Sequence, residues 1–245
     1  MLKRNLLLFA LTLSIGVTSQ TFKATQQKAA RVKSAYSEKW DGLKMDLAKK
    51  GINENFELFL RVFKADKVVE VWLKPKAEKE YKLFKTYAIC ASSGELGPKR
   101  MQGDGQVPEG FYSIAVFNPY SSYYLSLGVS YPNASDKIIG KGNLGGDIMI
   151  HGNCVTIGCM PLTDMYIKEV YILAVEARNN GQQTIQVHIF PTKMDEKGMA
   201  FLVKENAKHT DFWKNLKTGY DFFEQKQQLP KVSVDKAGHY LFSEK

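Results

Sequence analysis

The sequence predicts a mainly β protein with flanking helices, an α+β fold, on three observations. Runs rich in β-branched and aromatic residues alternate with turn residues between positions 55 and 195, as in strands. Apolar residues recur every three or four positions before this region, as in a helix, and a short aromatic helix follows it. With 44% hydrophobic residues the chain can bury a sizeable core. We therefore expect one core domain over 55–195, an N-terminal helical extension over 20–54 and a C-terminal extension over 196–245.

The first segment, residues 1–19, has the layout of a secretory signal peptide. Lys3 and Arg4 precede the apolar run Leu6–Val17, and small residues follow up to Ser19. The run is shorter than the roughly 20 residues that span a bilayer. We expect cleavage near Ser19, export to the periplasm and no stable membrane span, with a retained anchor as the alternative.

The following elements are predicted in chain order. A helix is expected over 24–51, closed by Gly51, because Val32, Tyr36 and Leu43 fall on one face. The remaining elements are strands over 56–63, 67–74, 81–91, 110–117, 123–130, 145–152 and 184–191, helices over 161–181 and 211–223, and an irregular tail. The first two strands are expected to form a hairpin. A Gly- and Pro-rich loop of this length between 91 and 110 is usually functional.

Charge and cysteine content exclude several classes of protein. The chain has 34 Lys and Arg against 25 Asp and Glu, but the excess is dispersed, without the basic patch and interleaved aromatics of a nucleic-acid platform. A dispersed basic surface is compatible with an anionic cell wall. Three cysteines are too few for a disulfide-stapled scaffold, and the odd number leaves at least one without a partner in the chain.

The stretch "IHGNCVTIGCMP" places His151, Cys154 and Cys159 close together. Three interpretations are open: a disulfide between the two cysteines, a zinc site with His151, or a thiol nucleophile with its base. A structural zinc site needs four ligands, usually in two pairs, and no second pair accompanies these residues elsewhere in the sequence, so neither a metal nor a cofactor is expected. Cys90 lies in a predicted strand and is expected to be a buried, inert core residue. Cys154 is expected to be a small packing residue.

The nucleophile interpretation accounts for most of the stretch. Cys159 precedes a helix expected to start near Leu162, and a helix N-terminus lowers the pKa of a thiol. Gly158 permits a tight turn, so that the N–H groups of Gly158 and Cys159 would form an oxyanion hole. His151 at the end of a strand would be the general base. Thr156 would steady His151 or the substrate, and Asn153 would line the loop between base and nucleophile.

The same residues resemble a known family. "TIGC", residues 156–159, matches an [ST]-x-G-C motif, "IMIHG" at 148–152 matches an upstream histidine strand, and "VPEGFY" at 107–112 matches a third signature. Together they resemble the YkuD-type L,D-transpeptidases, most closely the YafK-like branch. The resemblance implies a β-sandwich-like catalytic domain over 55–195 and acyl transfer on peptidoglycan stem peptides, with Cys159 as nucleophile and His151 as base.

Two positions depart from the commoner pattern of that family. Ile157 stands where many members have a second histidine, and Pro161 where they have Arg or Asn. The resemblance therefore leaves open whether the acceptor is an amine, giving transpeptidation, or water, giving hydrolysis. A wall-attached protein is a second partner that the branch suggests. A non-catalytic wall-binding module, a zinc hydrolase and a redox protein remain the alternatives.

Further residues are candidates for contact with the substrate. Lys99 and Arg100 in the long loop would contact an anionic peptide, and Tyr112 and Asn153 would line the cleft. A structural role competes for the loop, in which Asp104 organises an Asx turn. Tyr120, Tyr123 and Tyr124 are expected to pack within the sheet or to form a wall of the cleft. His188 is expected to be a core or edge residue.

Overall fold

The structure is a computed structural model that describes residues 21–244. The signal peptide expected over 1–19 and its cleavage near Ser19 fall outside the described residues. Within 21–244 no helix has both the length and the apolar character needed to cross a bilayer.

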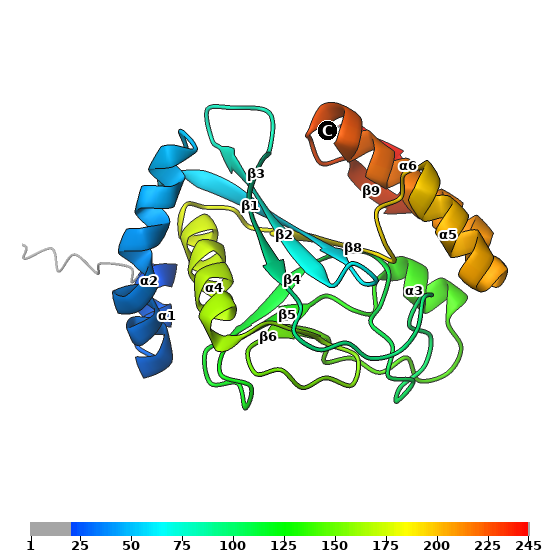
Figure 1. Cartoon of the computed structure of the whole chain (residues 1–245), viewed down its shortest axis with the longest axis horizontal. Coiled ribbons are helices and arrows are strands. Elements are labelled where there is room, and N and C mark those ends of the chain that lie inside the picture. Colours follow the sequence, from blue (N-terminus) through cyan, green and yellow to red (C-terminus); the bar gives the residue numbers. More distant parts are fainter. Residues whose placement is uncertain (1–20, 245) are drawn as a thin grey trace, which may run out of the picture.

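The centre of the molecule is one curled sheet of eight strands, which confirms the predicted α+β class (Figure 1). Its spatial order is β3-β2-β1-β8-β4-β5-β6-β7. The strands are β1 (Phe56–Phe63), β2 (Val68–Pro75), β3 (Lys82–Ala88), β4 (Gly110–Asn118), β5 (Ser126–Val129), β6 (Met149–His151), β7 (Met160–Pro161) and β8 (Gln186–Phe190). The β1–β2 hairpin is antiparallel, as predicted. A register shift between β4 and β5, near Ile114, breaks the regular pairing where the sheet curls.

Strand β1 is buried on both faces because helices cover both sides of the sheet. Leu58, Leu60 and Val62 point into the larger core under α4, whereas Phe59 and Phe63 point to the opposite side. This alternation follows from the two-residue period of a strand. Successive side chains of β1 therefore fill two separate apolar layers.

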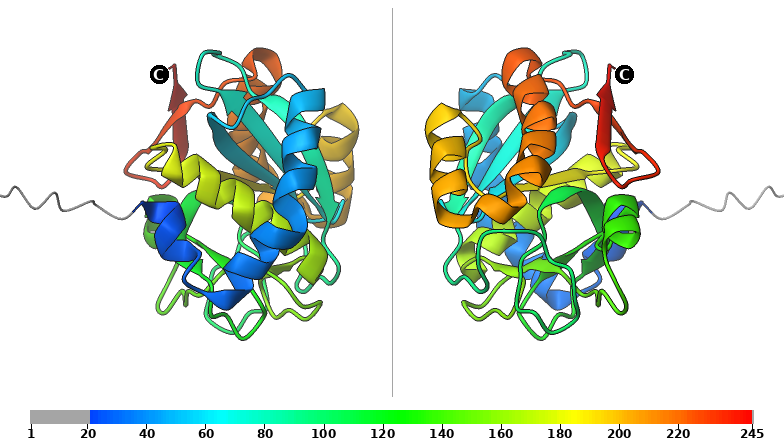
Figure 2. Two further views of the ribbon diagram at one scale, coloured as in Figure 1. Left: turned by 90° about the vertical axis from the view of Figure 1, so that its left-hand side faces the viewer. Right: turned by 90° about the vertical axis from the view of Figure 1, so that its right-hand side faces the viewer.

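On one face, α4 (Asp164–Asn179) packs on the sheet and is covered in turn by α1 (Phe22–Gln26) and α2 (Ala30–Lys49) (Figure 2). Thr163 caps α4, as predicted: its Oγ1 accepts from the N–H of Tyr166. The prediction of a single helix over 24–51 was wrong at its N-terminal end, where the structure has two helices. The chain turns at Gln27–Ala29, where Ala29 is extended and buried, so that α1 and α2 pack separately against α4.

The opposite face is covered by the C-terminal extension. Its elements are α5 (Glu196–Asn206), the short η1 (Ala207–His209), α6 (Thr210–Lys226), β9 (Lys231–Val234) and β10 (Tyr240–Ser243). The irregular tail predicted after α6 was wrong, because β9 and β10 form a hairpin closed by Asp235, whose Oδ1 accepts from Ala237 and His239 N–H groups. The short helix α3 (Ala134–Ile139) was also not predicted. The domain boundaries near 55 and 195 stay predictions.

Candidate active site

The turn that carries Cys159 is closed by the side chain of Thr156. Thr156 Oγ1 donates to the carbonyl of Cys159 at 2.9 Å and accepts from the N–H of Cys159 at 2.8 Å and of Gly158 at 3.2 Å. The structure therefore differs from the expected oxyanion hole, since both N–H groups already have an acceptor. Thr156 organises the nucleophile turn, and no hydrogen bond joins it to His151 among the described residues.

The Cys159 thiol is half-buried and lies 3.5 Å from the carbonyl oxygen of Asp147. Burial raises the pKa of this thiol above its usual 9.0, and the nearby Asp147 carboxylate raises it further. The expectation of a pKa lowered by a helix N-terminus was wrong. Helix α4 starts only at Asp164, and β7 separates it from the thiol.

His151 ends β6 and is 2% exposed. Its Nδ1 lies 2.6 Å from the carbonyl oxygen of Gly152, which can only accept, so Nδ1 carries the proton and Nε2 has the free lone pair. The Tyr123 ring lies 4.7 Å from the His151 ring, centroid to centroid. Burial lowers the pKa of His151 below 6.5, which keeps the ring neutral and able to accept a proton near pH 7.

Pairing of β6 with β7 brings His151 and the segment that follows Cys159 to the same edge of the sheet. The two strands are parallel, and His151 pairs with Pro161. Cys159 lies in the turn that leads into β7, two residues before Pro161. A neutral imidazole beside a protonated thiol suits general-base activation of the thiol during attack.

A disulfide joins Cys90 to Cys154, which corrects two expectations and excludes one alternative. Cys90 is exposed at the end of β3 and not an inert core residue, Cys154 is not a mere packing residue, and the disulfide considered between Cys154 and Cys159 was wrong. Cys159 is the one free thiol among residues 21–244. The bond ties the segment after β3 to the loop between His151 and Cys159. The sequence could not select this pair, because 64 positions separate its members.

The zinc interpretation loses a ligand through the same bond. It required thiolates from both Cys154 and Cys159, and Cys154 is bonded to Cys90. Within residues 21–244 no group of three or more His, Cys, Asp or Glu side chains is arranged to hold a metal ion.

Three of the four expected substrate contacts have internal partners instead. Lys99 is buried and pairs with Asp104 at 2.6 Å, Arg100 pairs with Asp136 at 2.7 Å, and the hydroxyl of Tyr112 donates to Asp136 at 2.9 Å. These contacts explain why the side chains are held beneath the long loop. The structural alternative is confirmed for Asp104, whose carboxylate also accepts from the N–H groups of Arg100, Met101 and Gln106.

Asn153 lies in a left-handed conformation, with φ of 62°, and its N–H donates to Asp164 Oδ1 at 2.9 Å. It lines a hollow beside Cys154 and Arg31 and does not line the cavity at Cys159. His188 is buried against the rings of Phe59 and Phe111, as expected of a core histidine.

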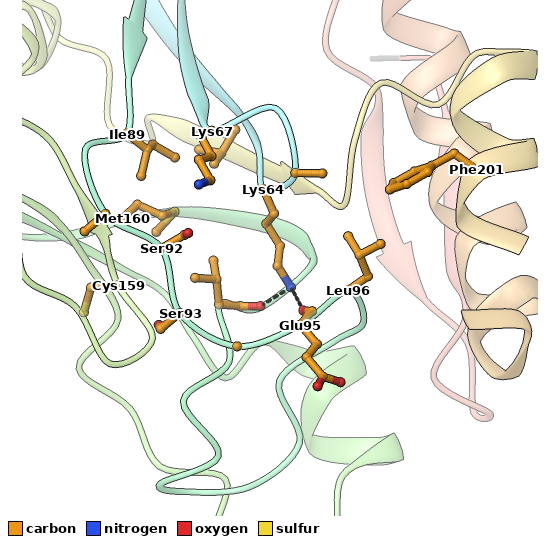
Figure 3. A pocket seen from close by; sticks show the side chains of 15 residues that line it. Lys64, Lys67, Ile89, Ser92, Ser93, Glu95, Leu96, Cys159, Met160 and Phe201 are labelled. Atoms are coloured by element: carbon orange, nitrogen blue, oxygen red, sulfur yellow. Dashed lines mark hydrogen bonds between the residues drawn. The ribbon is translucent and has the colours of Figure 1, made fainter. Parts of the chain in front are cut away.

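A cavity of about 250 Å³ opens beside Cys159 (Figure 3). Its wall comes from the β1–β2 turn, the segment after β3, the start of β7 and helix α5. The polar side chains in the wall are Lys64, Lys67, Ser92, Ser93, Glu95 and Cys159. Sequence reasoning missed Lys67 and Ser93, since the cavity joins segments far apart in the chain. The length of the Gly-rich loop was a signal for Ser93, and no signal pointed to Lys67.

The far wall of this cavity is fixed by the buried carboxylate of Glu109, in the "VPEG" signature. Glu109 Oε1 accepts from Lys64 Nζ at 2.9 Å and from the N–H of Gly97 at 2.8 Å, and Oε2 accepts from Trp213 Nε1 at 2.8 Å. Helix α6 is thereby joined to the long loop. The C-terminal extension thus supports the wall of the site.

Replacement of Gly158 by alanine is expected to disturb the nucleophile turn. Gly158 has a φ of +129°, and an added Cβ would lie 3.1 Å from the carbonyl oxygen of Gln106. Such backbone positions cost about 1–3 kcal/mol for other residues. We expect a lower melting temperature and slower modification of Cys159 by a substrate or an alkylating reagent. Gly146→Ala is the control, because its φ is not positive and its Cβ would meet nothing within 4 Å. Equal behaviour of the two variants would contradict the prediction.

Comparison with known proteins places this arrangement in a family. No family model matches the chain. The chain is 39% identical over 188 residues to the protein named "Putative L,D-transpeptidase YafK" of Escherichia coli K12, covering 76% of this chain and 74% of the relative, and to the same protein of strain O157:H7. The chain belongs to the L,D-transpeptidase family. Its place is in the YafK-like branch, as the three sequence motifs indicated.

Two solved structures are also similar to this L,D-transpeptidase family member. The helical cell shape determining protein Pgp2 of Campylobacter jejuni has a TM-score of 0.45 and 19% identity, covering 74% of each chain. Bd1075 of Bdellovibrio bacteriovorus has a TM-score of 0.39 and 18% identity, covering 71% of this chain and 59% of that one.

The two departures from the commoner L,D-transpeptidase pattern have clear positions in the structure. Ile157 is 89% exposed, so the residue before Gly158 presents an apolar side chain to solvent where other members have a histidine. Pro161 is buried and pairs with His151 across β6 and β7. Neither position places a polar group beside Cys159.

Proposed function

We propose that this protein is an exported cysteine enzyme that transfers the acyl group of an L,D-type amide bond in peptidoglycan stem peptides. The observation that carries the proposal is the free thiol of Cys159, which opens into a cavity and lies two residues before Pro161, the residue that pairs with His151 across β6 and β7. Membership of the L,D-transpeptidase family supports peptidoglycan as the substrate.

The proposed reaction has two steps. Nε2 of His151 takes the proton of Cys159 as Sγ attacks the carbonyl carbon, the C–N bond breaks, and the departing amine receives that proton from His151. The acyl group is now a thioester on Sγ. An amine of a second stem peptide, or water, then loses a proton to His151 and attacks the thioester, which releases the thiol and the product. An amine acceptor gives a cross-link and water gives hydrolysis.

Export is the second part of the proposal. The layout of residues 1–19 supports it, and so does the Cys90–Cys154 disulfide, because disulfides persist in oxidising compartments such as the periplasm. The mass of the mature protein from the periplasmic fraction would test it. A chain beginning close to residue 20 is expected, and a full-length chain in the cytoplasm would contradict export.

The activity is tested by intact-protein mass spectrometry after incubation with a purified stem tetrapeptide. We expect a covalent adduct with the mass of the acyl tripeptide on the wild type and none on Cys159→Ala. Cross-linked or hydrolysed peptides in the supernatant would identify the acceptor. Binding of peptidoglycan without adduct or product would instead support the wall-binding module.

A further inference from the structure

We propose that Lys64 is a positioning residue for the nucleophile: it holds together the two arms of the long loop, and one arm fixes the turn of Cys159 through Gln106. The inference rests on the proposed function and deepens it, because it names what keeps the thiol in place. The two arms are residues 94–97 and 106–109. Lys64, residues of both arms and Cys159 line the same cavity (Figure 3).

The ammonium of Lys64 is the point at which the two arms meet. In the first arm, Nζ donates to the carbonyls of Glu95 at 3.1 Å and Gly97 at 2.8 Å. In the second arm, it donates to the carbonyl of Val107 and to the carboxylate of Glu109, both at 2.9 Å. The dashed lines in Figure 3 mark two of these bonds. An ammonium has only three N–H groups, so its donors are used within the protein.

The position of this ammonium is fixed by the sheet and by the C-terminal extension. Lys64 directly follows β1, and its N–H donates to the carbonyl of Phe190, at the end of β8, at 3.0 Å. Its counter-ion Glu109 is fully buried and accepts from Trp213 in α6. The long loop has no helix or strand between residues 89 and 109, all of which the structure describes. The loop therefore takes its position from a side chain that rigid elements hold.

Gln106 is the residue of the second arm that touches the turn of Cys159. Its carbonyl oxygen is so close to Gly158 that an added Cβ there would lie 3.1 Å from it. The side-chain Oε1 of Gln106 accepts from the N–H of Glu95 in the first arm at 3.0 Å. Gln106 also precedes Val107, whose carbonyl accepts from the ammonium. A shift of this arm would therefore displace the backbone next to the thiol.

Lys64 should affect catalysis through position and not through contact with the substrate. Because its N–H groups already have acceptors in the two arms, its removal takes no hydrogen bond from a ligand. It does release the arm on which the nucleophile turn rests. A misplacement of a reacting atom by about 1 Å can lower a rate by roughly 100-fold. The loss is therefore expected in kcat, with little change in KM.

The test compares Glu109→Gln with Lys64→Met/Glu109→Gln, a pair that differs only in Lys64. The double variant buries no unpaired carboxylate, which Lys64→Met alone would do and which is strongly destabilising. With a stem tetrapeptide at saturation, we expect the double variant to form the thioester about 10–100-fold more slowly, with KM changed less than about threefold. Lys236→Met, at the exposed β9–β10 turn, is the control and should alter neither value.

Hydrogen exchange followed by mass spectrometry gives a readout that needs no activity. It is measured well below the melting temperature of both proteins, so that a lower overall stability does not contribute. Exchange in the double variant should be faster than in Glu109→Gln over residues 94–109 and also over 156–160, the nucleophile turn. The β9–β10 hairpin, which does not contact Lys64, should exchange at the same rate in both.

Faster exchange confined to 94–109, equal kcat in the two proteins, or a loss that falls on KM would overturn the assignment. Faster exchange in both segments without any thioester on the wild type would sustain the contact between loop and turn and refute the proposed acyl transfer. A thioester on the wild type with unchanged exchange in the double variant would keep the acyl transfer and refute the role of Lys64.

Discussion

His151→Asn is expected to lower kcat/KM by about 10²–10⁴-fold at pH 7 while the fold is kept. The Asn side-chain amide can reproduce the donation from Nδ1 to the carbonyl of Gly152. The fall in kcat/KM would therefore measure the contribution of the Nε2 lone pair alone. The base is needed because burial raises the pKa of Cys159 above 9.0, which leaves at most about one thiol in a hundred ionised at pH 7. Rates of adduct formation and melting curves would measure the two effects.

The pH profile separates a base from a structural residue. Because the pKa of His151 is lowered, the wild-type rate should persist below pH 6.5 before protonation of the ring stops it. Without the base, the rate of His151→Asn should rise with pH as thiolate forms. The ratio of the wild-type rate to the variant rate should therefore fall towards pH 10. His239→Gln, on the exposed β9–β10 turn, is the control. A ratio of wild-type to variant rate that is the same at every pH would contradict the role of His151 as general base.

Loss of the Cys90–Cys154 disulfide is expected to lower the free energy of unfolding by about 4 kcal/mol. The bond closes a loop across a sequence separation of 64, and loops of that size restrict the unfolded chain by about this amount. For a chain of this length the melting temperature should fall by roughly 8–16 °C. Thermal unfolding of Cys90→Ser/Cys154→Ser beside the wild type would measure it.

The reductant provides the matched control. Dithiothreitol should lower the melting temperature of the wild type towards that of the double variant and leave the double variant unchanged. An equal effect of the reductant on both proteins, or identical melting temperatures, would contradict a structural disulfide.

The local patterns in the sequence predicted the elements that carry their own signal. The β1–β2 hairpin, β8 and the cap of α4 at Thr163 follow from alternation and capping chemistry, which act over a few residues. The break at Ala29 and the β9–β10 hairpin escaped prediction. Both depend on packing against distant elements, α4 in the first case and the sheet with α6 in the second.

The residues of the candidate site also divide into those that a local sequence pattern marks and those that depend on distant contacts. His151 and Cys159 could be predicted as base and nucleophile because a nine-residue stretch contains both. The partners of Lys99, Arg100 and Tyr112 were not found, because Asp136 meets the long loop only in the folded chain. The pKa of Cys159 was predicted in the wrong direction for a similar reason, since burial by distant segments outweighs the local effect of the following helix.

If Cys159 is the nucleophile, as proposed, the pairing of the other two cysteines also protects it during biosynthesis. In the proposed export, Cys90 and Cys154 would leave the export channel before Cys159, so the first pair that an oxidising enzyme meets would be the native one. Afterwards Cys159 has no intramolecular thiol with which to form a disulfide. Its raised pKa keeps it protonated, and only a thiolate attacks a disulfide by exchange. With His151 as the proposed base, a thiol that stays protonated until attack would therefore persist reduced in the proposed oxidising compartment.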